Sequence, residues 1–148
     1  MTKVFGVGNL LFGDEAIGIR VVESLKEKIE SLGDSIEVFT CETNKLSCIS
    51  NICDNDKVII IDSTNFMTRP GLITIKVLDE CDDFISYDNS LIGLLRKEKI
   101  KVRGHFIGIE VSKIDYSVNL SKALTKRFNC ICDIVYDEIV KIMAYSRE

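Results

Sequence analysis

Apolar residues recur along the chain with the spacing of strands and helices in turn. Val58–Ile61 is a run of four β-branched apolar residues, and such a run is typical of a strand buried on both faces of a parallel sheet. Ile17, Val21, Leu25 and Ile29 recur every four residues, which predicts a helix with one buried face. The chain therefore predicts helices packed on a central sheet.

The remaining pattern completes a single α/β domain over residues 1–148. The strand predicted over 72–77 follows Asp62 after about nine residues, which is short for a parallel crossover, so we expect it to run antiparallel at an edge. Asn119 or Ser121 can cap the final helix. The architecture predicted is a mostly parallel five-stranded sheet flanked by helices. Further strands are predicted over 4–7, 36–40 and within 102–111, and further helices over 44–52, from 91 to 95 and from about 120 to 143.

Composition excludes several partners. The 148 residues are 46% hydrophobic and 28% charged, with a formal net charge of -4, as in a soluble globular protein. The basic residues form no stripe, so no nucleic-acid partner is expected. No stretch approaches the ~20 apolar residues of a membrane span, and no signal peptide is evident. We therefore expect a cytoplasmic protein with no membrane partner.

The cysteines form no Cys-x-x-Cys pair, which a zinc ribbon or a redox site would need. In a cytoplasmic protein, small buried hydrophobic residues are the better interpretation than disulfides or metal ligands. Two of them lie two apart in the predicted final helix and should point to different sides. The six are Cys41, Cys48, Cys53, Cys81, Cys130 and Cys132.

Two acids follow the loop that joins the first strand to the first helix. Asp14 is expected to accept hydrogen bonds from the free amides of the first helical turn, which leaves Glu15 to point elsewhere; that both acids simply cap is the alternative. Asp62 ends the central strand, where an acid is costly unless it is solvated or paired. Because ligands bind at the carboxyl ends of strands where strand order reverses, Glu15 and Asp62 should share one crevice. A solvated strand-end acid is the alternative for Asp62.

A nucleotide site is a poorer explanation of the same loop. Gly6-Val7-Gly8 resembles the start of G-x-G-x-x-G, but Leu11 occupies the third glycine position. Asp14 and Glu15 would repel a pyrophosphate at the helix N-terminus. No nucleotide is therefore expected.

The segment Gly8–Glu23, followed by Ile59–Asp62, resembles the [NiFe]-hydrogenase maturation endopeptidases. The resemblance implies a three-layer αβα fold of the phosphorylase/hydrolase-like type, with a twisted five-stranded sheet that contains one antiparallel strand. It implies that the chain removes the C-terminal peptide of a hydrogenase large-subunit precursor after nickel insertion. The nickel would be supplied by that precursor, which is the implied partner.

The resemblance also implies the site residues. The family holds nickel with a glutamate, an aspartate and a histidine, and Glu15 and Asp62 match the first two as catalytic and metal-binding residues. Gly8, Asn9, Gly13 and Asp14 would form a substrate loop.

The histidine has no match, because Tyr87 or Asp88 stands in its place. Asp88 is the candidate third ligand. A carboxylate-only set would favour a harder divalent cation than nickel. The sole histidine, His105, could reach the site only if the fold brings it there. The alternative function is a divergent relative that binds a hydrogenase-like precursor without cutting it. The family's Gly-Gly-Thr segment also differs, since it reads Cys41-Glu42-Thr43 here.

Overall fold

The computed structural model describes residues 1–80 and 90–145. Its centre is a five-stranded sheet in the order β2-β1-β3-β5-β4. All neighbouring pairs are parallel except β4 and β5, which run antiparallel. The predicted sheet, with its antiparallel edge strand, is confirmed. The strands are β1 (Thr2–Val7), β2 (Ile36–Cys41), β3 (Lys57–Thr64), β4 (Ile73–Val77) and β5 (Arg103–Glu110).

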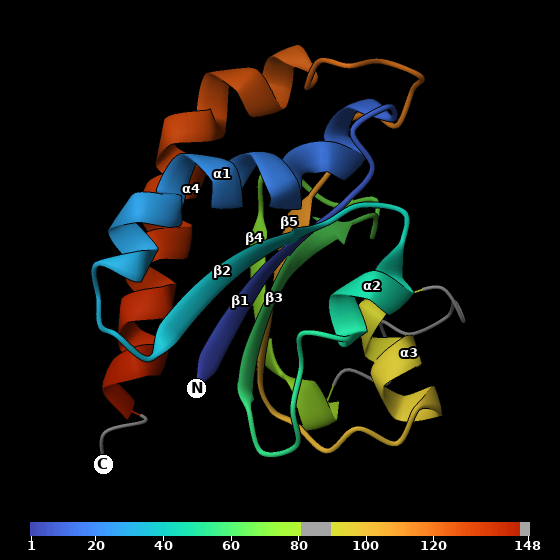
Figure 1. The fold of residues 1–148 in the computed structure, drawn as a ribbon. Coiled ribbons are helices and arrows are strands. Elements are labelled where there is room, and N and C mark those ends of the chain that lie inside the picture. Colours follow the sequence, from blue (N-terminus) through green and yellow to red (C-terminus); the bar gives the residue numbers. More distant parts are fainter. Residues whose placement is uncertain (81–89, 146–148) are drawn as a thin grey trace.

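Helices cover both faces of this sheet (Figure 1). The long helices α1 and α4 lie on one face, and the short helices α2 and α3 lie on the other. Ser121 caps α4, since its Oγ accepts a hydrogen bond from the amide of Leu124, so one of the two predicted caps is confirmed. The helices are η1 (Gly13–Ala16), α1 (Ile17–Glu30), α2 (Lys45–Ile49), η2 (Leu78–Glu80), α3 (Leu91–Lys97) and α4 (Lys122–Tyr145).

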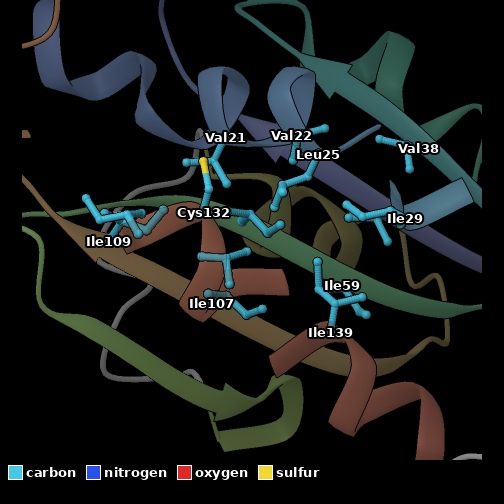
Figure 2. Close-up of a cluster of buried hydrophobic side chains, with 14 of the residues drawn as sticks. Val21, Val22, Leu25, Ile29, Val38, Ile59, Ile107, Ile109, Cys132 and Ile139 are labelled. Atoms are coloured by element: carbon cyan, nitrogen blue, oxygen red, sulfur yellow. The ribbon is translucent and has the colours of Figure 1, made fainter. Parts of the chain in front are cut away.

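Alternation along the strands divides the core in two. Ile59 and Ile61 of β3 point toward α1 and α4, whereas Val58 and Ile60 point toward α2 and α3. Figure 2 shows the larger cluster, in which the helical stripe predicted for α1 packs over β3 and β5. Burying each large aliphatic side chain stabilises the fold by about 1.5–3 kcal/mol. The all-apolar run of β3 is therefore explained by burial on both faces.

The cysteine prediction is wrong in part. Cys41 at the end of β2 and Cys48 in α2 form a disulfide, whereas no disulfide was expected. Cys53 and Cys130 are exposed thiols, and only Cys132 is a buried free cysteine among the described residues. Cys130 and Cys132 do lie on different sides of α4, as expected. The spacing rule failed because a seven-residue separation across a strand–helix turn carries no signature of its own.

Within residues 1–80 and 90–145, no helix is long and apolar enough to cross a membrane.

Candidate active site

The carboxyl ends of β1 and β3 lie side by side where the strand order reverses. From β1 the chain moves outward to β2 on one side, while β3 pairs on the other side. Gly6 is opposite Ile61 in the register, so Asp62 comes at the end of β1, from which the loop to Glu15 departs. The expected meeting of these two segments at one edge of the sheet is confirmed.

Glycines bring the start of α1 into direct contact with these strand ends. A side chain on Gly18 would collide with the carbonyl oxygens of Val7 and Ile61, and one on Gly8 would collide with the carbonyl oxygen of Glu15. Only glycine permits this backbone approach. The three segments are therefore packed closely enough to place Glu15 next to the end of β3.

Hydrogen bonds within the loop, and one to Ser117, hold the segment that precedes Glu15. The amide of Asn9 donates to the carbonyl of Glu15 at 3.3 Å, and its side-chain Oδ1 accepts from the amide of Leu11 at 3.0 Å. Gly13 has a φ of 57°, in the left-handed region that favours glycine. Its amide donates to the carbonyl of Ser117 at 2.8 Å. Gly8, Asn9 and Gly13 thus shape the loop, and its contact with a substrate stays a prediction.

Asp14 does not cap the first helix, which corrects the expectation above. Neither η1 nor α1 has a side-chain cap. Instead the fully buried carboxylate of Asp14 accepts hydrogen bonds from the amides of Ser112, Lys113 and Ser121 at 2.7–2.9 Å. These amides come from the segment between β5 and α4, so Asp14 joins distant parts of the chain. Its carboxylate supports the loop from within and is covered by protein.

Asp62 has an unusual proton affinity. Its side chain follows Val58 and Ile60 on the α2 side of the sheet, and burial raises its pKa to about 7, with the charge of Glu15 acting in the same direction. The amide of Ser63 donates to Asp62 Oδ1 at 2.7 Å and opposes this rise, as does the charge of Lys45. Because the charge of Glu15 contributes to the raised pKa of Asp62, the two side chains lie in one electrostatic neighbourhood.

Sequence reasoning missed Lys45. This residue opens α2, its side chain is half-buried, and its charge acts on Asp62. Lys45 belongs to no recognisable sequence motif, so the sequence gives no reason to single it out. Only the placement of α2 over the end of β3 reveals it.

Sequence reasoning also missed Glu110. Like Asp62, it is an acid near the end of an apolar strand, which is the signal that singled out Asp62. It ends β5 as Asp62 nears the end of β3, and it is 1% exposed. Its carboxylate accepts hydrogen bonds from Thr64 Oγ1 at 2.8 Å and from the amides of Phe66 and Thr68 at 3.0 Å. Burial favours the neutral acid, but these hydrogen bonds outweigh it and hold the pKa of Glu110 below its usual range. Glu110 therefore fixes the segment that follows Asp62.

His105 lies away from these carboxylates. It pairs with Ile59, whereas Asp62 pairs with Gly108, three residues further along β5. His105 shares its face with Ile107, toward α4, and therefore points to the opposite side of the sheet from Asp62. Burial, together with the charge of Lys57, lowers the pKa of the imidazole. The fold does not bring the sole histidine to the site.

The third ligand position lies outside the described residues, since Tyr87 and Asp88 fall between 81 and 89. Within 1–80 and 90–145, no group of three or more histidine, cysteine, aspartate or glutamate side chains is placed to hold a metal ion. The described part of the candidate site is therefore a pair of carboxylates with a neighbouring lysine.

Comparisons of sequence identify relatives. No family model matches the chain. It is 29% identical, over 93% of its length and 96% of the relative's, to a Methanocaldococcus jannaschii protein provisionally named a hydrogenase maturation protease. It is 38% identical to the Hydrogenase 2 maturation protease of Escherichia coli, over 49% of this chain. It spans 44% of the length of that second relative.

Solved structures with a similar fold include hydrogenase maturation endopeptidases. The hydrogenase maturating endopeptidase HybD from E. coli superposes with a TM-score of 0.76 at 21% identity, over 95% of this chain and 92% of that one. The [NiFe] hydrogenase maturation protease HycI from Thermococcus kodakarensis superposes with a TM-score of 0.73 at 22% identity, with the same coverage. The relatives named in both comparisons are peptidases. In sequence the chain is similar to hydrogenase maturation proteases, and its fold matches that of solved [NiFe]-hydrogenase maturation endopeptidases, which is the resemblance that its opening loop indicated.

Proposed function

We propose that the protein is an endopeptidase that removes the C-terminal peptide of a [NiFe]-hydrogenase large-subunit precursor after nickel insertion. The observation that carries the proposal is the position of Glu15 and Asp62 at the switch point of the sheet, where the charge of Glu15 helps to raise the pKa of Asp62. Ligands of open α/β sheets bind at this place. The names of the relatives supply the substrate class.

The two carboxylates suit a metal that arrives already partly coordinated. Two oxygen ligands from this chain would leave the remaining coordination positions to the precursor. Nickel bound there would polarise the scissile carbonyl or activate a water molecule. Carboxylates are harder ligands than imidazole, so another divalent cation is the alternative.

Asp62 is also suited to proton transfer. A pKa of about 7 leaves the acid partly protonated at neutral pH before any cation binds, which is the range in which a general acid or base works best. The amide of Ser63 orients its carboxylate. In this proposal Glu15 and Asp62 would hold the metal, and a carboxylate that is not bound to it would take up or return the proton.

An exposed apolar surface next to the loop supports a polypeptide substrate. Leu11 is 49% exposed and Phe12 37% exposed, just ahead of Glu15 in the chain. Phe12 meets Tyr116 edge to face, with ring centroids 5.8 Å apart, and Tyr116 is itself largely exposed. Exposed apolar side chains that gather in one place are typical of interaction sites. We propose that they contact the precursor.

The test is cleavage of a nickel-loaded precursor by purified protein. We expect Glu15→Gln and Asp62→Asn each to slow cleavage about 100-fold or more, because each removes a charged ligand and, at Asp62, the proton carrier. Nickel affinity in the presence of precursor, measured by calorimetry, should fall in both variants. Glu27→Gln, an exposed acid on α1, is the matched control and should cleave normally.

Undiminished cleavage by the Glu15→Gln, Asp62→Asn double variant would contradict the proposal. If the wild-type protein binds the precursor but never cleaves it, the alternative holds, and the chain is a divergent binding protein. Restoring histidine at position 87 or 88 then distinguishes a decayed enzyme, which should gain nickel binding, from a protein built only to bind.

A further inference from the structure

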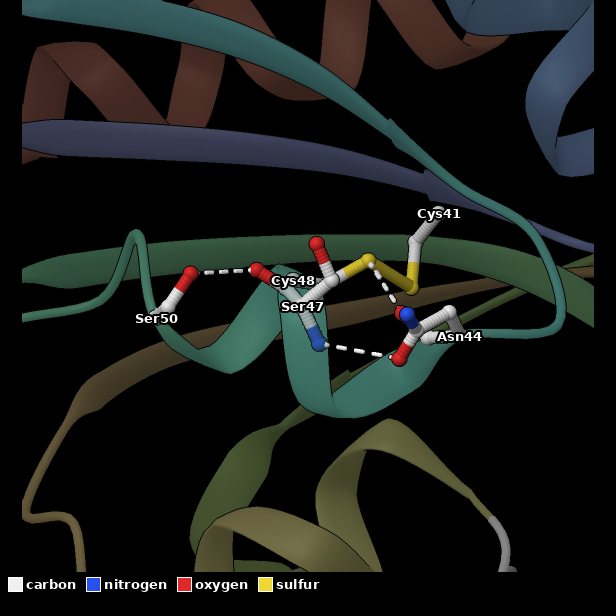
Figure 3. Close-up of a disulfide and its surroundings, with 5 residues drawn as sticks. All are labelled: Cys41, Asn44, Ser47, Cys48 and Ser50. Carbon is white, nitrogen blue, oxygen red and sulfur yellow. Dashed lines mark hydrogen bonds between the residues drawn. A yellow bond between two sulfur atoms is a disulfide. The ribbon is translucent and has the colours of Figure 1, made fainter.

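The Cys41–Cys48 disulfide joins the end of β2 to α2 (Figure 3). Cys41 is the last residue of β2, opposite Val7 in the register, and its carbonyl accepts a hydrogen bond from the amide of Gly8 at 3.0 Å. The disulfide thus begins at the strand end that supports the glycine loop. It ends in α2, the helix whose first residue is Lys45.

Helix α2 is too short to hold its place by itself. It has five residues, and its start is capped by Asn44, whose Oδ1 accepts a hydrogen bond from the amide of Ser47. Cys48 and Ile49 are its buried residues, while Leu46 is 63% exposed. Isolated helices of this length are unstable in water. The covalent link from Cys48 to β2 therefore adds a second constraint on where α2 lies, beside the packing of Ile49 in the core.

We propose that the Cys41–Cys48 disulfide is a redox-dependent positioning element, which fixes α2 against the end of β2 and so holds the Lys45 ammonium beside Asp62. This inference rests on the proposed function for its effect on cleavage, but not for its structural part. Lys45 is half-buried and its charge reaches Asp62. With α2 fastened, the site contains two carboxylates and one cation; with α2 released, the cation is no longer held there.

The reductant is a dithiol, the class that keeps thiols reduced in a cytoplasm. Cys48 keeps 8% of its surface exposed, whereas Cys41 keeps none, so the dithiol attacks Cys48 Sγ. The S–S bond breaks, Cys41 leaves as a thiolate and takes a proton. The second thiol of the reductant then displaces Cys48, which also takes a proton. Two electrons and two protons pass to the protein, and the dithiol becomes a disulfide.

The reduced helix need not unfold. Cys48 Sγ lies 3.5 Å from the carbonyl oxygen of Asn44, so a thiol at this position can donate a hydrogen bond to the preceding turn. Reduction would then break the covalent tie to β2, while α2 keeps this local bond and the packing of Ile49 in the core. The expected change is in the position of Lys45 and not in the fold of the sheet.

The structural part is tested on the full chain without substrate. Lysine acylation, followed by mass spectrometry, should label Lys45 several-fold faster after treatment with dithiothreitol, because the released side chain is more accessible. Lys26, an exposed lysine on α1, should label equally in both states. The Cys41→Ser, Cys48→Ser double variant should label like the reduced protein, and Cys130→Ser should behave like the wild type. Equal labelling of Lys45 in both states would overturn the proposal.

The functional part is tested by cleavage kinetics. We expect reduction to lower kcat about tenfold with little change in KM, because the lost charge acts at the carboxylate pair and not where the precursor docks. Lys45→Met should have the same effect in the oxidised protein and no further effect in the reduced one, while Lys26→Met is neutral. Cleavage that is equal in both redox states overturns this proposal and leaves the proposed function standing. If neither state cleaves, the proposed function fails, and the labelling result still decides the structural part.

Discussion

The acids of this protein form two contrasting pairs. Asp14 and Glu15 are adjacent in sequence, yet Asp14 is fully buried and accepts three amide hydrogen bonds, while Glu15 is partly exposed. Glu110 and Asp62 come late in the paired strands β5 and β3. Within residues 1–80 and 90–145, Glu110 accepts hydrogen bonds from three residues and Asp62 from one. Asp14 and Glu110 are held by hydrogen bonds from several groups of the fold. Glu15 and Asp62 are less constrained and can interact with a ligand.

The contrast shows how the surroundings shift the pKa of a carboxyl group in opposite directions. Hydrogen bonds to the ionised form outweigh burial at Glu110 and lower its pKa, whereas burial dominates at Asp62 and raises its pKa. A carboxylate held by amides stabilises loops. A partly buried carboxylate with fewer such partners costs stability when it is ionised, and it is therefore a candidate for chemistry.

The largest expected change in the free energy of unfolding distinguishes Asp14 from Glu15. Asp14→Ala should lower the free energy of unfolding by about 3–5 kcal/mol, because it leaves the buried amides of Ser112, Lys113 and Ser121 without an acceptor. Glu15→Ala should change it by about 0.5 kcal/mol or less, as at an ordinary surface position. Urea denaturation of both variants measures this. Equal losses would mean that the two acids do not have different roles.

Substitutions at Glu110 and Asp62 should change the free energy of unfolding in opposite directions at neutral pH. Glu110→Gln should lower the free energy of unfolding by about 2 kcal/mol at pH 7, because it weakens hydrogen bonds to a buried charge. The folded-state pKa of Glu110 lies below its unfolded value, so its contribution is present above about pH 4.5 and lost as pH falls further. The difference between variant and wild type should therefore shrink in acid. A difference that stays constant down to pH 3 would refute this account of Glu110.

Asp62→Asn should instead stabilise the protein. The folded-state pKa of about 7 lies above the ordinary aspartate pKa of 3.8. The folded state therefore binds more protons between these two values, and wild-type stability falls as pH rises through them. At pH 8 the variant should gain about 1–3 kcal/mol, and below pH 4 it should gain nothing. Thermal unfolding across this range measures the effect. If the variant is destabilised at pH 8, Asp62 is a structural acid like Glu110.

The sequence could predict the fold because the fold depends on patterns that repeat. The stripe of α1 and the run Val58–Ile61 identified both faces of the sheet. The short link before β4 identified its antiparallel direction, since a parallel crossover needs more chain. Each of these inferences uses local spacing and nothing else.

The candidate site was predictable only in part. Position in the sheet was enough to bring Glu15 and Asp62 together. The partners of Asp14 are about one hundred residues away, at Ser112, Lys113 and Ser121, and no local pattern reports contacts at that separation. Lys45 and the disulfide were missed because both depend on where α2 lies over the sheet, which no local spacing reports.

The smallest expected effect tests how firmly Asp14 holds the start of α4. Ser121 has two roles: its Oγ caps Leu124, and its backbone amide donates to Asp14 at 2.7 Å. Ser121→Ala removes only the cap and should cost about 1 kcal/mol, because the backbone bond to Asp14 remains. In an Asp14→Ala background the same substitution should cost less, since the start of α4 is then already loosened. A double-mutant cycle by urea denaturation measures this coupling. Strict additivity would show that Asp14 organises only the 112–113 turn, and that the cap alone fixes where α4 begins.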